Sequence, residues 1–293
     1  MSLKVKIGAS KQNLSRFALI YDQIRFEEKA LIRAAEELGL SINPLSSKTL
    51  VLRSDSPPEL DFALIRCISY FRGLHIASIL NGLNISTISS FFTLNIAGNK
   101  LFATSALLKH GVKTPKTYIA FTPKSAGEAA ESLGYPVVLK PVVGSWGRLI
   151  ALIRDSDTAD AIFEDRSYMY PLYQIYYLQE FVEKPSRDIR CIMIGGEPVA
   201  AIYRYSPPGD WKTNVAIGGR AESCEINDEL AEISIKASEA VKGEFVGVDI
   251  MEAEGRYLVH EINPTPEFKA TMSATGKNIA AEVIKYIKRK LRR

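Results

Sequence analysis

Three oxygen-bearing side chains near the carboxyl end of the chain are suited to hold a hard metal ion. Asp249 precedes a turn near Gly255, and Glu261 and Asn263 follow it. If a hairpin turns through a three-residue loop centred on Gly255, residue 249 pairs with 261 at a Cβ separation of roughly 4.5–5.5 Å. Asn263 then points to the same face. Because Mg²⁺ favours a few carboxylates together with substrate phosphates, we predict a magnesium site. The alternative, a solvated hairpin face, fits the apolar surroundings of these carboxylates less well.

Two lysines and a glycine-rich turn are suited to bind phosphates. Lys140 ends the apolar run YPVVLKP, and Lys100 follows a Gly-Asn pair in a predicted helix. A lysine is a compact point charge for a phosphate, and the turn GSWGR (144–148) can fold its N–H groups around an anion. This turn is neither a Walker A motif nor a G-x-G-x-x-G fingerprint. Each feature alone fits a surface lysine or a plain loop equally well.

The segment YYLQEFVEKPSRDIR (176–190) has the features of a nucleotide-binding linker. A polar pair, Gln179-Glu180, lies between apolar residues and precedes a dense cluster of charges. A strand followed by a short linker offers backbone groups to an adenine, while Asp188 or Glu183 accepts hydrogen bonds from ribose hydroxyls. The alternative is a strand end with ion-paired charges.

A second polar segment, RYSPPGDWKTN, follows a predicted hairpin. It contains Arg204, Lys212 and Asn214, and its Pro-Pro-Gly sequence marks a loop. We expect this loop to hold an anionic substrate or to cover the phosphates.

The elements that position these residues change in character along the chain. Apolar runs at 16–22 and 61–67 precede helical patterns over Phe26–Leu38 and Tyr70–Leu80, which predicts a parallel sheet with helical crossovers. Residues 45–59 are expected to form a connecting loop.

The remainder is predicted to be antiparallel α+β. A helix is expected from about Thr93 to His110, followed by strands in TYIAF and YPVVLKP. Hairpins are expected to turn at Gly195-Gly196 and near Gly255, and a helix from about Asn278 closes the chain.

The composition is that of an ordinary globular protein. Of 293 residues, 46% are hydrophobic and 24% charged, which excludes a disordered, collagen-like or disulfide-scaffold protein. No apolar run reaches the ~18 residues of a membrane span and the start lacks a signal-peptide core, so we predict a cytoplasmic protein without membrane contact. The three cysteines are far apart in the sequence and are expected in the core: Cys67, Cys191 and Cys224. The three histidines are too scattered to form a metal cluster: His75, His110 and His260.

The net charge of +4 is unevenly distributed. Residues 288–293 (KRKLRR) carry five positive charges, so the rest of the chain has a net charge of −1 and is not expected to bind nucleic acid. The tail either attracts an acidic partner, contacts RNA, or is a solvated helix end that suits the helix macrodipole.

From about residue 16 to 290, the order of these segments resembles the ATP-grasp superfamily. The motifs are Lys100, Lys140, GSWGR, QEFV, RDIR, WKTN, GVDIM and HEINPTPEF. The pattern is most similar to the LysX/ArgX ligases that act on the amino-group carrier protein LysW, and next to the RimK glutamate ligases.

The resemblance implies three parts with ATP held between the last two. These are an N-terminal α/β pre-ATP-grasp domain (1–90, including an extension over 1–15), a central α+β subdomain (91–180) and a C-terminal α+β subdomain (181–293). It also implies a site. The ATP-binding residues implied are the phosphate-contacting lysines Lys100 and Lys140, the mobile glycine-rich loop Gly144, Ser145, Trp146, Gly147 and Arg148, the adenine hinge Gln179, Glu180 and Val182, and the nucleotide contact Asp188. The implied catalytic residues are the basic positions Arg190 and Arg204 and, in the polar loop, Lys212 and Asn214. The implied magnesium ligands are Asp249, Glu261 and Asn263.

The activity implied by the resemblance is ATP-dependent ligation of a carboxylate to an amine, with Mg²⁺. A carboxylate attacks the γ-phosphate of ATP, and an amine then displaces phosphate from the acyl phosphate. In the LysW ligases the carboxylate is the side chain of the carrier's C-terminal glutamate, and the amine belongs to α-aminoadipate or glutamate. Family ligases are often dimers or tetramers, so a homo-oligomer is expected.

Two positions after EFK separate the amino-acid specificities in this family. Gly-Phe resembles the glutamate-specific members, and Asn followed by Thr or Ala resembles the aminoadipate-specific ones. Ala270 and Thr271 match neither pair fully. Thr271 favours α-aminoadipate, and use of both amino acids stays open because one methylene contributes only about 1–3 kcal/mol.

Two alternatives to a LysW ligase stay open. One is a RimK-like enzyme that adds glutamate to another protein or peptide. The other is a non-catalytic ATP- or RNA-binding protein, which the intact set Asp249, Glu261 and Asn263 disfavours.

Overall fold

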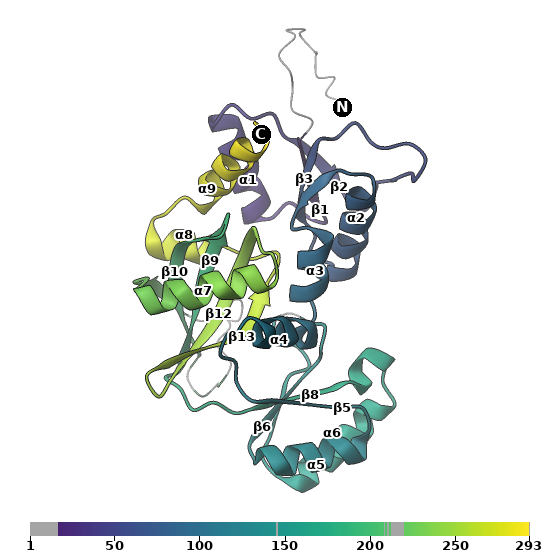
Figure 1. Ribbon diagram of the computed structural model, residues 1–293, viewed down its shortest axis with the longest axis vertical. Coiled ribbons are helices and arrows are strands. Elements are labelled where there is room, and N and C mark those ends of the chain that lie inside the picture. Colours follow the sequence, from purple (N-terminus) through teal and green to yellow (C-terminus); the bar gives the residue numbers. More distant parts are fainter. Residues whose placement is uncertain (1–16, 145, 208, 210, 212–219, 293) are drawn as a thin grey trace.

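The computed structural model describes residues 17–144, 146–207, 209, 211 and 220–292. It has three sheets, and along the length of the molecule the last sheet in the chain lies between the other two (Figure 1). The predicted extension at 1–15 lies outside the described residues. None of the helices in the described part is long and apolar enough to cross a membrane.

The first sheet is parallel, as predicted, with the strand order β2-β1-β3-β4. The expected loop at 45–59 is wrong at its start, where Leu45 and Ser46 belong to a strand. That strand is short, half exposed and at the sheet edge, so it lacks the apolar run that marks a buried strand. The elements are β1 (Phe17–Tyr21), α1 (Phe26–Glu37), β2 (Asn43–Ser46), β3 (Phe62–Arg66), α2 (Tyr70–Gly82) and β4 (Ser86–Ile88).

The single helix expected from Thr93 to His110 is wrong: two helices, α3 (Phe91–Ala97) and α4 (Lys100–Lys109), occupy this segment. They separate at Gly98, where a Cβ would lie 2.0 Å from the ring of Tyr70. The side chain of Asn99 then caps α4 by accepting hydrogen bonds from the backbone N–H groups of Leu101 and Phe102, at 3.0 and 3.3 Å. Lys100 therefore begins a helix instead of lying inside one.

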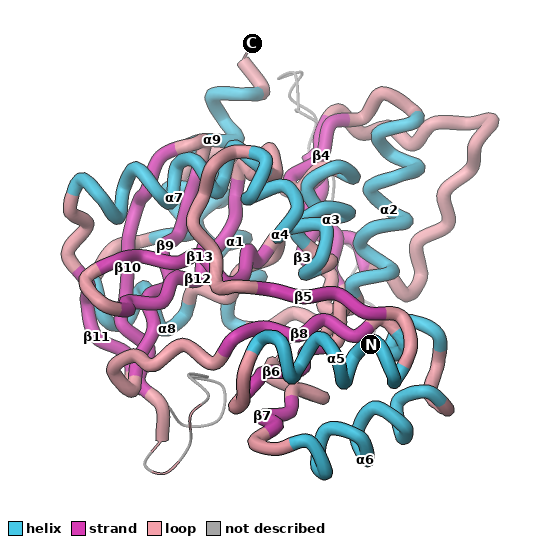
Figure 2. The backbone as a smooth tube through the Cα atoms, turned by 60° about the horizontal axis from the view of Figure 1, so that its bottom comes forward, coloured by secondary structure: helices cyan, strands magenta, loops and turns pink. Residues whose placement is uncertain are grey.

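The second sheet is antiparallel, with the order β5-β8-β6-β7. The two longer helices of this part lie side by side over it (Figure 2). The elements are β5 (Thr117–Ala120), α5 (Pro123–Leu133), β6 (Val137–Lys140), β7 (Ala151–Ile153), α6 (Ser156–Ser167), the 3₁₀ turn η1 (Pro171–Gln174) and β8 (Tyr176–Glu180).

The third sheet is also antiparallel, with the order β11-β10-β9-β12-β13, and its first hairpin turns at Gly195-Gly196 as predicted. The elements are β9 (Arg187–Ile194), β10 (Glu197–Tyr205), β11 (Ala221–Cys224), α7 (Asp228–Ala240), β12 (Phe245–Ala253), β13 (Arg256–Asn263), α8 (Lys269–Thr275) and α9 (Ile279–Lys290).

The second hairpin pairs Asp249 with Glu261, as predicted, but by a different route. Its turn has two residues, Glu254 and Gly255, both with positive φ, as in a type I′ turn. A regular ladder from this turn would pair Asp249 with His260. Because the register shifts by one residue, His260 is left as the extra residue of a bulge, and Glu261 moves opposite Asp249.

The first and third sheets share a hydrophobic core. One buried cluster fixes the N-terminal part against the C-terminal sheet. It includes Leu31 of α1, Phe245 of β12, Phe268 just before α8, and Ile284 of α9. The three cysteines are free and buried, as predicted.

Two charges of the basic tail contact the protein itself. The ammonium of Lys290 lies 2.6 Å from Glu244, and the ammonium of Lys288 donates to the carbonyl of Leu38. The end of the helix is therefore partly docked on the protein, an arrangement that is not among the three alternatives expected for residues 288–293.

Candidate active site

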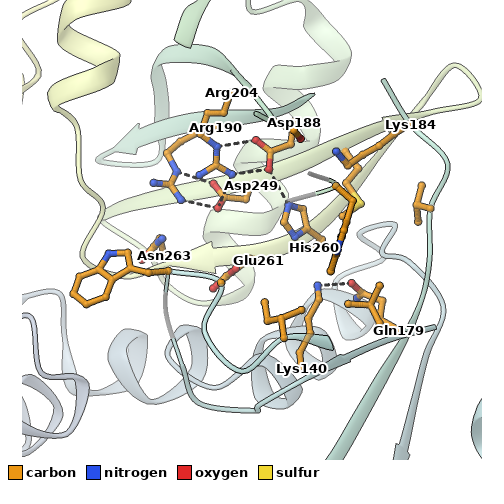
Figure 3. Close-up of a pocket in the computed structure, with 18 of the residues that line it drawn as sticks. Lys140, Gln179, Lys184, Asp188, Arg190, Arg204, Asp249, His260, Glu261 and Asn263 are labelled. Carbon is orange, nitrogen blue, oxygen red and sulfur yellow. Dashed lines mark hydrogen bonds and ion pairs between the residues drawn. The ribbon is translucent and has the colours of Figure 1, made fainter. Parts of the chain in front are cut away.

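A cavity of about 710 Å³ brings most of the predicted residues together. One wall consists of the inward-facing side chains of β9, β10, β12 and β13, and the opposite wall of β6 and β8 (Figure 3). The linker 181–186 closes one end, and Arg25, Cys67 and Ile68 of the N-terminal part close the other.

Two buried carboxylates and two arginines form an ion-paired group on the first wall. Arg190 donates two hydrogen bonds to Asp249, at 2.8 and 2.6 Å, and Arg204 donates two to Asp188, at 2.7 and 2.8 Å. Arg204 also lies 3.1 Å from Asp249 and so joins both pairs. Burial disfavours ionisation of both carboxyl groups, but the arginines outweigh it and hold the pKa values of Asp188 and Asp249 below the usual range. Both carboxylates are therefore ionised.

The three predicted metal ligands all line this cavity: Asp249, Glu261 and Asn263. Burial opposes ionisation of Glu261, but the ammonium of Lys100, 3.2 Å away, outweighs it and lowers its pKa. Within the described part of the chain, no group of three or more His, Cys, Asp or Glu could hold a metal ion. The donor set is two ionised carboxylates and one amide oxygen, which fits Mg²⁺ when substrate phosphates complete the coordination.

Lys140 lies on the opposite wall. Its ammonium donates to Gln179 Oε1 at 2.6 Å, and the amide of Gln179 donates to the hydroxyls of Thr117 and Tyr177, both at 3.2 Å. Burial lowers the pKa of Lys140 to about 8, even though Glu261, Asp188 and Asp249 act in the opposite direction. This lysine is therefore a cation that loses its charge at mildly alkaline pH.

Only part of the glycine-rich turn reaches the cavity. Trp146 and Gly147 line it, whereas Gly144 and Arg148 do not. Arg148 lies over the ring of Trp146, 5.1 Å from its centroid, and the carbonyl of Gly144 accepts from the ammonium of Lys100 at 2.9 Å. The turn is therefore joined to a predicted phosphate-binding lysine. Ser145 lies outside the described residues.

The predicted hinge also lines the cavity, through Gln179, Glu180 and Val182. Glu180 is fixed from both sides, because its N–H donates to the carbonyl of Lys116 at 2.9 Å and its side chain accepts from the N–H of Lys116 at 2.8 Å. The two candidates for a ribose contact, Asp188 and Glu183, both line the cavity; Asp188 accepts hydrogen bonds from Arg204, and the ribose contact stays a prediction. Lys212 and Asn214 lie outside the described residues.

The specificity pair predicted from the resemblance does not line the cavity. Ala270 and Thr271 lie in the first turn of α8. Thr271 is 1% exposed, and its hydroxyl has no hydrogen-bond partner among the described residues. The role of this pair stays a prediction.

The sequence prediction missed several residues of the cavity. His260 reaches it from the bulge, with Nε2 3.6 Å from Asp188 Oδ2. At the N-terminal end lie Arg25, Cys67, Ile68, Thr265 and Glu267. Arg25 and Glu267 are 242 positions apart in the chain, so no local spacing could have connected them.

Comparison with known proteins gives matches over nearly the whole described chain. Residues 17–96 match the LysX preATP-grasp domain, and residues 97–287 match the RimK-like ATP-grasp domain. The α-aminoadipate–LysW ligase LysX of Sulfurisphaera tokodaii is 38% identical over 276 residues, which cover 92% of this chain and 96% of that protein. The glutamate–LysW ligase ArgX of Sulfolobus acidocaldarius is 36% identical over 276 residues, which cover 93% of this chain and 98% of that protein.

A solved structure with the same fold is the RimK domain ATP-grasp protein of Sphaerobacter thermophilus. It aligns with a TM-score of 0.78 at 21% identity, covering 92% of this chain and 98% of that chain.

Proposed function

The chain belongs to the RimK-like ATP-grasp family of ligases, and we propose that it joins α-aminoadipate, glutamate or both to the carrier protein LysW. The predicted ATP-grasp fold and the predicted ligase class are confirmed by that membership. The choice of LysW is supported by similarity to both a LysX and an ArgX along more than nine-tenths of this chain.

One observation carries the proposed chemistry. Four cations, Lys100, Lys140, Arg190 and Arg204, are held by carboxylates or polar groups in and beside the cavity that the hinge closes. A nucleoside triphosphate brings negative charge that such cations neutralise, and they need little rearrangement to do so.

In the proposed reaction, the side-chain carboxylate of the carrier's C-terminal glutamate attacks the γ-phosphate of ATP. Lys140 and Lys100 hold the phosphates, and Arg190 and Arg204 offset the charge that gathers where the phosphoryl group is transferred. ADP leaves, and the amino group of the amino acid then displaces phosphate from the acyl phosphate to form the amide.

The residues proposed to hold Mg²⁺ are Asp249, Glu261 and Asn263. When bound, the ion neutralises phosphate charge and acts as a Lewis acid. The pairing of Asp249 with Arg190 and of Glu261 with Lys100 keeps both carboxylates ionised, and so ready to bind a cation.

The remaining predictions fit this proposal and stay proposals. The three sheets support the proposed three-part organisation, in which ATP lies between the second and third parts. We also propose that the enzyme acts in the cytoplasm and that it assembles as a homo-oligomer. The docked positions of Lys288 and Lys290 leave fewer charges of the basic tail to attract an acidic carrier.

The direct test measures ADP release by the purified enzyme with LysW and Mg²⁺. We expect sustained ADP release over many turnovers to require LysW and an amino acid together, with α-aminoadipate and glutamate compared at equal concentration. A RimK-like activity would instead release ADP with another protein or peptide and glutamate. Absence of turnover with every acceptor would contradict the proposal and favour a nucleotide-binding protein.

The pH dependence of ATP use is a second expected result. Because Lys140 loses its positive charge as the pH rises through about 8, kcat/KM for ATP should fall above that pH. Lys100 favours this loss of charge, whereas Glu261, Asp188 and Asp249 oppose it. A Lys140→Arg variant stays charged and should lack the alkaline fall, whatever its overall rate. An identical alkaline limb in both proteins would assign the fall to another group.

A further inference from the structure

The loop that follows the proposed metal ligands is attached to the N-terminal part of the protein by a series of hydrogen bonds. The carbonyl of Pro264 accepts from Ser89 at 2.6 Å, and the carbonyl of Pro266 accepts from Arg66 at 2.9 Å. Glu27 accepts from the N–H groups of Phe268 and Lys269 at 3.3 and 3.2 Å. Residues 264–269 are thus held in a fixed position relative to the first sheet.

Glu267 lies in the middle of this loop and faces the cavity. Its Oε1 accepts a hydrogen bond from Arg25 at 2.7 Å, yet its side chain remains 40% exposed. Arg25 is itself held by Glu28, through its backbone N–H at 2.9 Å and its guanidinium at 3.2 Å. Glu267 is therefore positioned through one oxygen and still accessible to a ligand.

Most of the charged side chains in the cavity already have a partner of opposite charge or a backbone partner. Lys140, Lys184, Arg190 and Arg204 line the part between the hinge and the metal-ligand strand. Asp188 and Asp249 are already engaged by arginines, Glu261 by Lys100, and Glu180 by the backbone of Lys116, while Glu183 belongs to the linker 181–186. Among the described carboxylates of the cavity that are neither proposed metal ligands nor part of the linker, Glu267 keeps an accessible oxygen, so an ammonium group is favoured beside it.

We propose that Glu267 binds the ammonium group of the incoming amino acid and accepts its proton, with Arg25 as the positioning residue. This inference rests on the proposed function and identifies the amine subsite of the same cavity. A carboxylate within hydrogen-bond reach is the kind of base that such a step requires.

The ammonium gives one proton to Glu267, and the freed nitrogen lone pair forms the C–N bond with the acyl carbon. The bond between that carbon and the phosphate oxygen breaks, and phosphate leaves with the second N–H proton. Glu267 then returns its proton to solvent.

The test separates the two halves of the reaction. Hydroxylamine is largely uncharged at neutral pH and attacks acyl phosphates without a base, so hydroxamate formation on LysW reports acyl-phosphate formation alone. A Glu267→Gln variant keeps an oxygen to accept from Arg25. We expect it to form hydroxamate at nearly the wild-type rate and to lose about 100-fold in kcat/KM for the amino acid. Glu267→Asp should recover part of this loss, and Glu282→Gln, an exposed substitution on α9, should change neither rate.

The other outcomes overturn the inference. Equal losses in hydroxamate formation and amino-acid ligation would place Glu267 in the first half-reaction or in folding, and unchanged amino-acid ligation would exclude it from the amine subsite. If wild-type enzyme forms hydroxamate on LysW but Glu267→Gln ligates normally, only this inference fails. If wild-type enzyme forms neither product with LysW, the proposed function fails and this inference with it.

Discussion

A Glu261→Gln variant is expected to lose about 100-fold or more in kcat/KM for ligation while remaining folded. The substitution keeps the shape of the side chain but removes one of the two carboxylate charges proposed to hold Mg²⁺. Glu261 is a better choice than Asp249, because its side chain is 29% exposed and its cationic partner is a single lysine. Removing Asp249 would leave Arg190 without its buried partner and confuse activity with stability.

The measurement that identifies a metal ligand is the Mg²⁺ dependence of the rate. In the variant, the Mg²⁺ concentration for half-maximal activity should rise. Glu252→Gln is the matched control, since Glu252 lies on the same hairpin and pairs with Arg187 at 2.9 Å, away from the cavity. This control should keep wild-type activity and Mg²⁺ dependence. A Glu261→Gln enzyme with wild-type Mg²⁺ dependence would remove Glu261 from the metal site.

An Arg204→Met variant is expected to lose about 3–5 kcal/mol of unfolding free energy. Arg204 is 6% exposed and neutralises two buried carboxylates, Asp188 and Asp249. The methionine fills similar space but leaves Asp188 without its bidentate partner. Urea unfolding, followed by tryptophan fluorescence, measures the loss.

Arg220→Met is the matched control for this prediction. Arg220 is 70% exposed and pairs with the exposed Glu222, so its removal should cost at most about 1 kcal/mol. The stability difference between wild type and Arg204→Met should also narrow as the pH falls below about 4. The low pKa values of Asp188 and Asp249 stabilise the wild-type fold at neutral pH, and this stabilisation is lost as the two groups become protonated. Equal losses from Arg204→Met and Arg220→Met would contradict the buried-charge account.

The predicted metal-ligand hairpin shows both the reach and the limit of sequence patterns. Alternation and a glycine turn were enough to place Asp249 opposite Glu261. The turn length was wrong, and a bulge at His260 that no residue pattern announced restored the pairing. The division between α3 and α4 had a local signal, Gly98-Asn99, whose meaning depends on the distant ring of Tyr70.

The end of the cavity that carries Arg25 and Glu267 could not be predicted. Neither residue belongs to an element predicted from the sequence, and only the shared core of the first and third sheets brings them together. The phosphate end was easier, because Lys100, Lys140 and the hinge lie in or beside short motifs whose order along the chain resembles that of the ATP-grasp superfamily. The part of the site that the sequence could not predict therefore depends on contacts between segments that are far apart in the chain.

Ligation of an amino acid to LysW is tested most directly by the intact mass of LysW after incubation with the enzyme, ATP, Mg²⁺ and one amino acid. We expect the carrier to gain the mass of one amino-acid residue, and omission of ATP to abolish this gain. Comparison of α-aminoadipate with glutamate identifies the substrate in the same experiment. A carrier of unchanged mass with both amino acids, under conditions in which the enzyme binds ATP, would contradict the claim that this cavity ligates an amino acid to LysW.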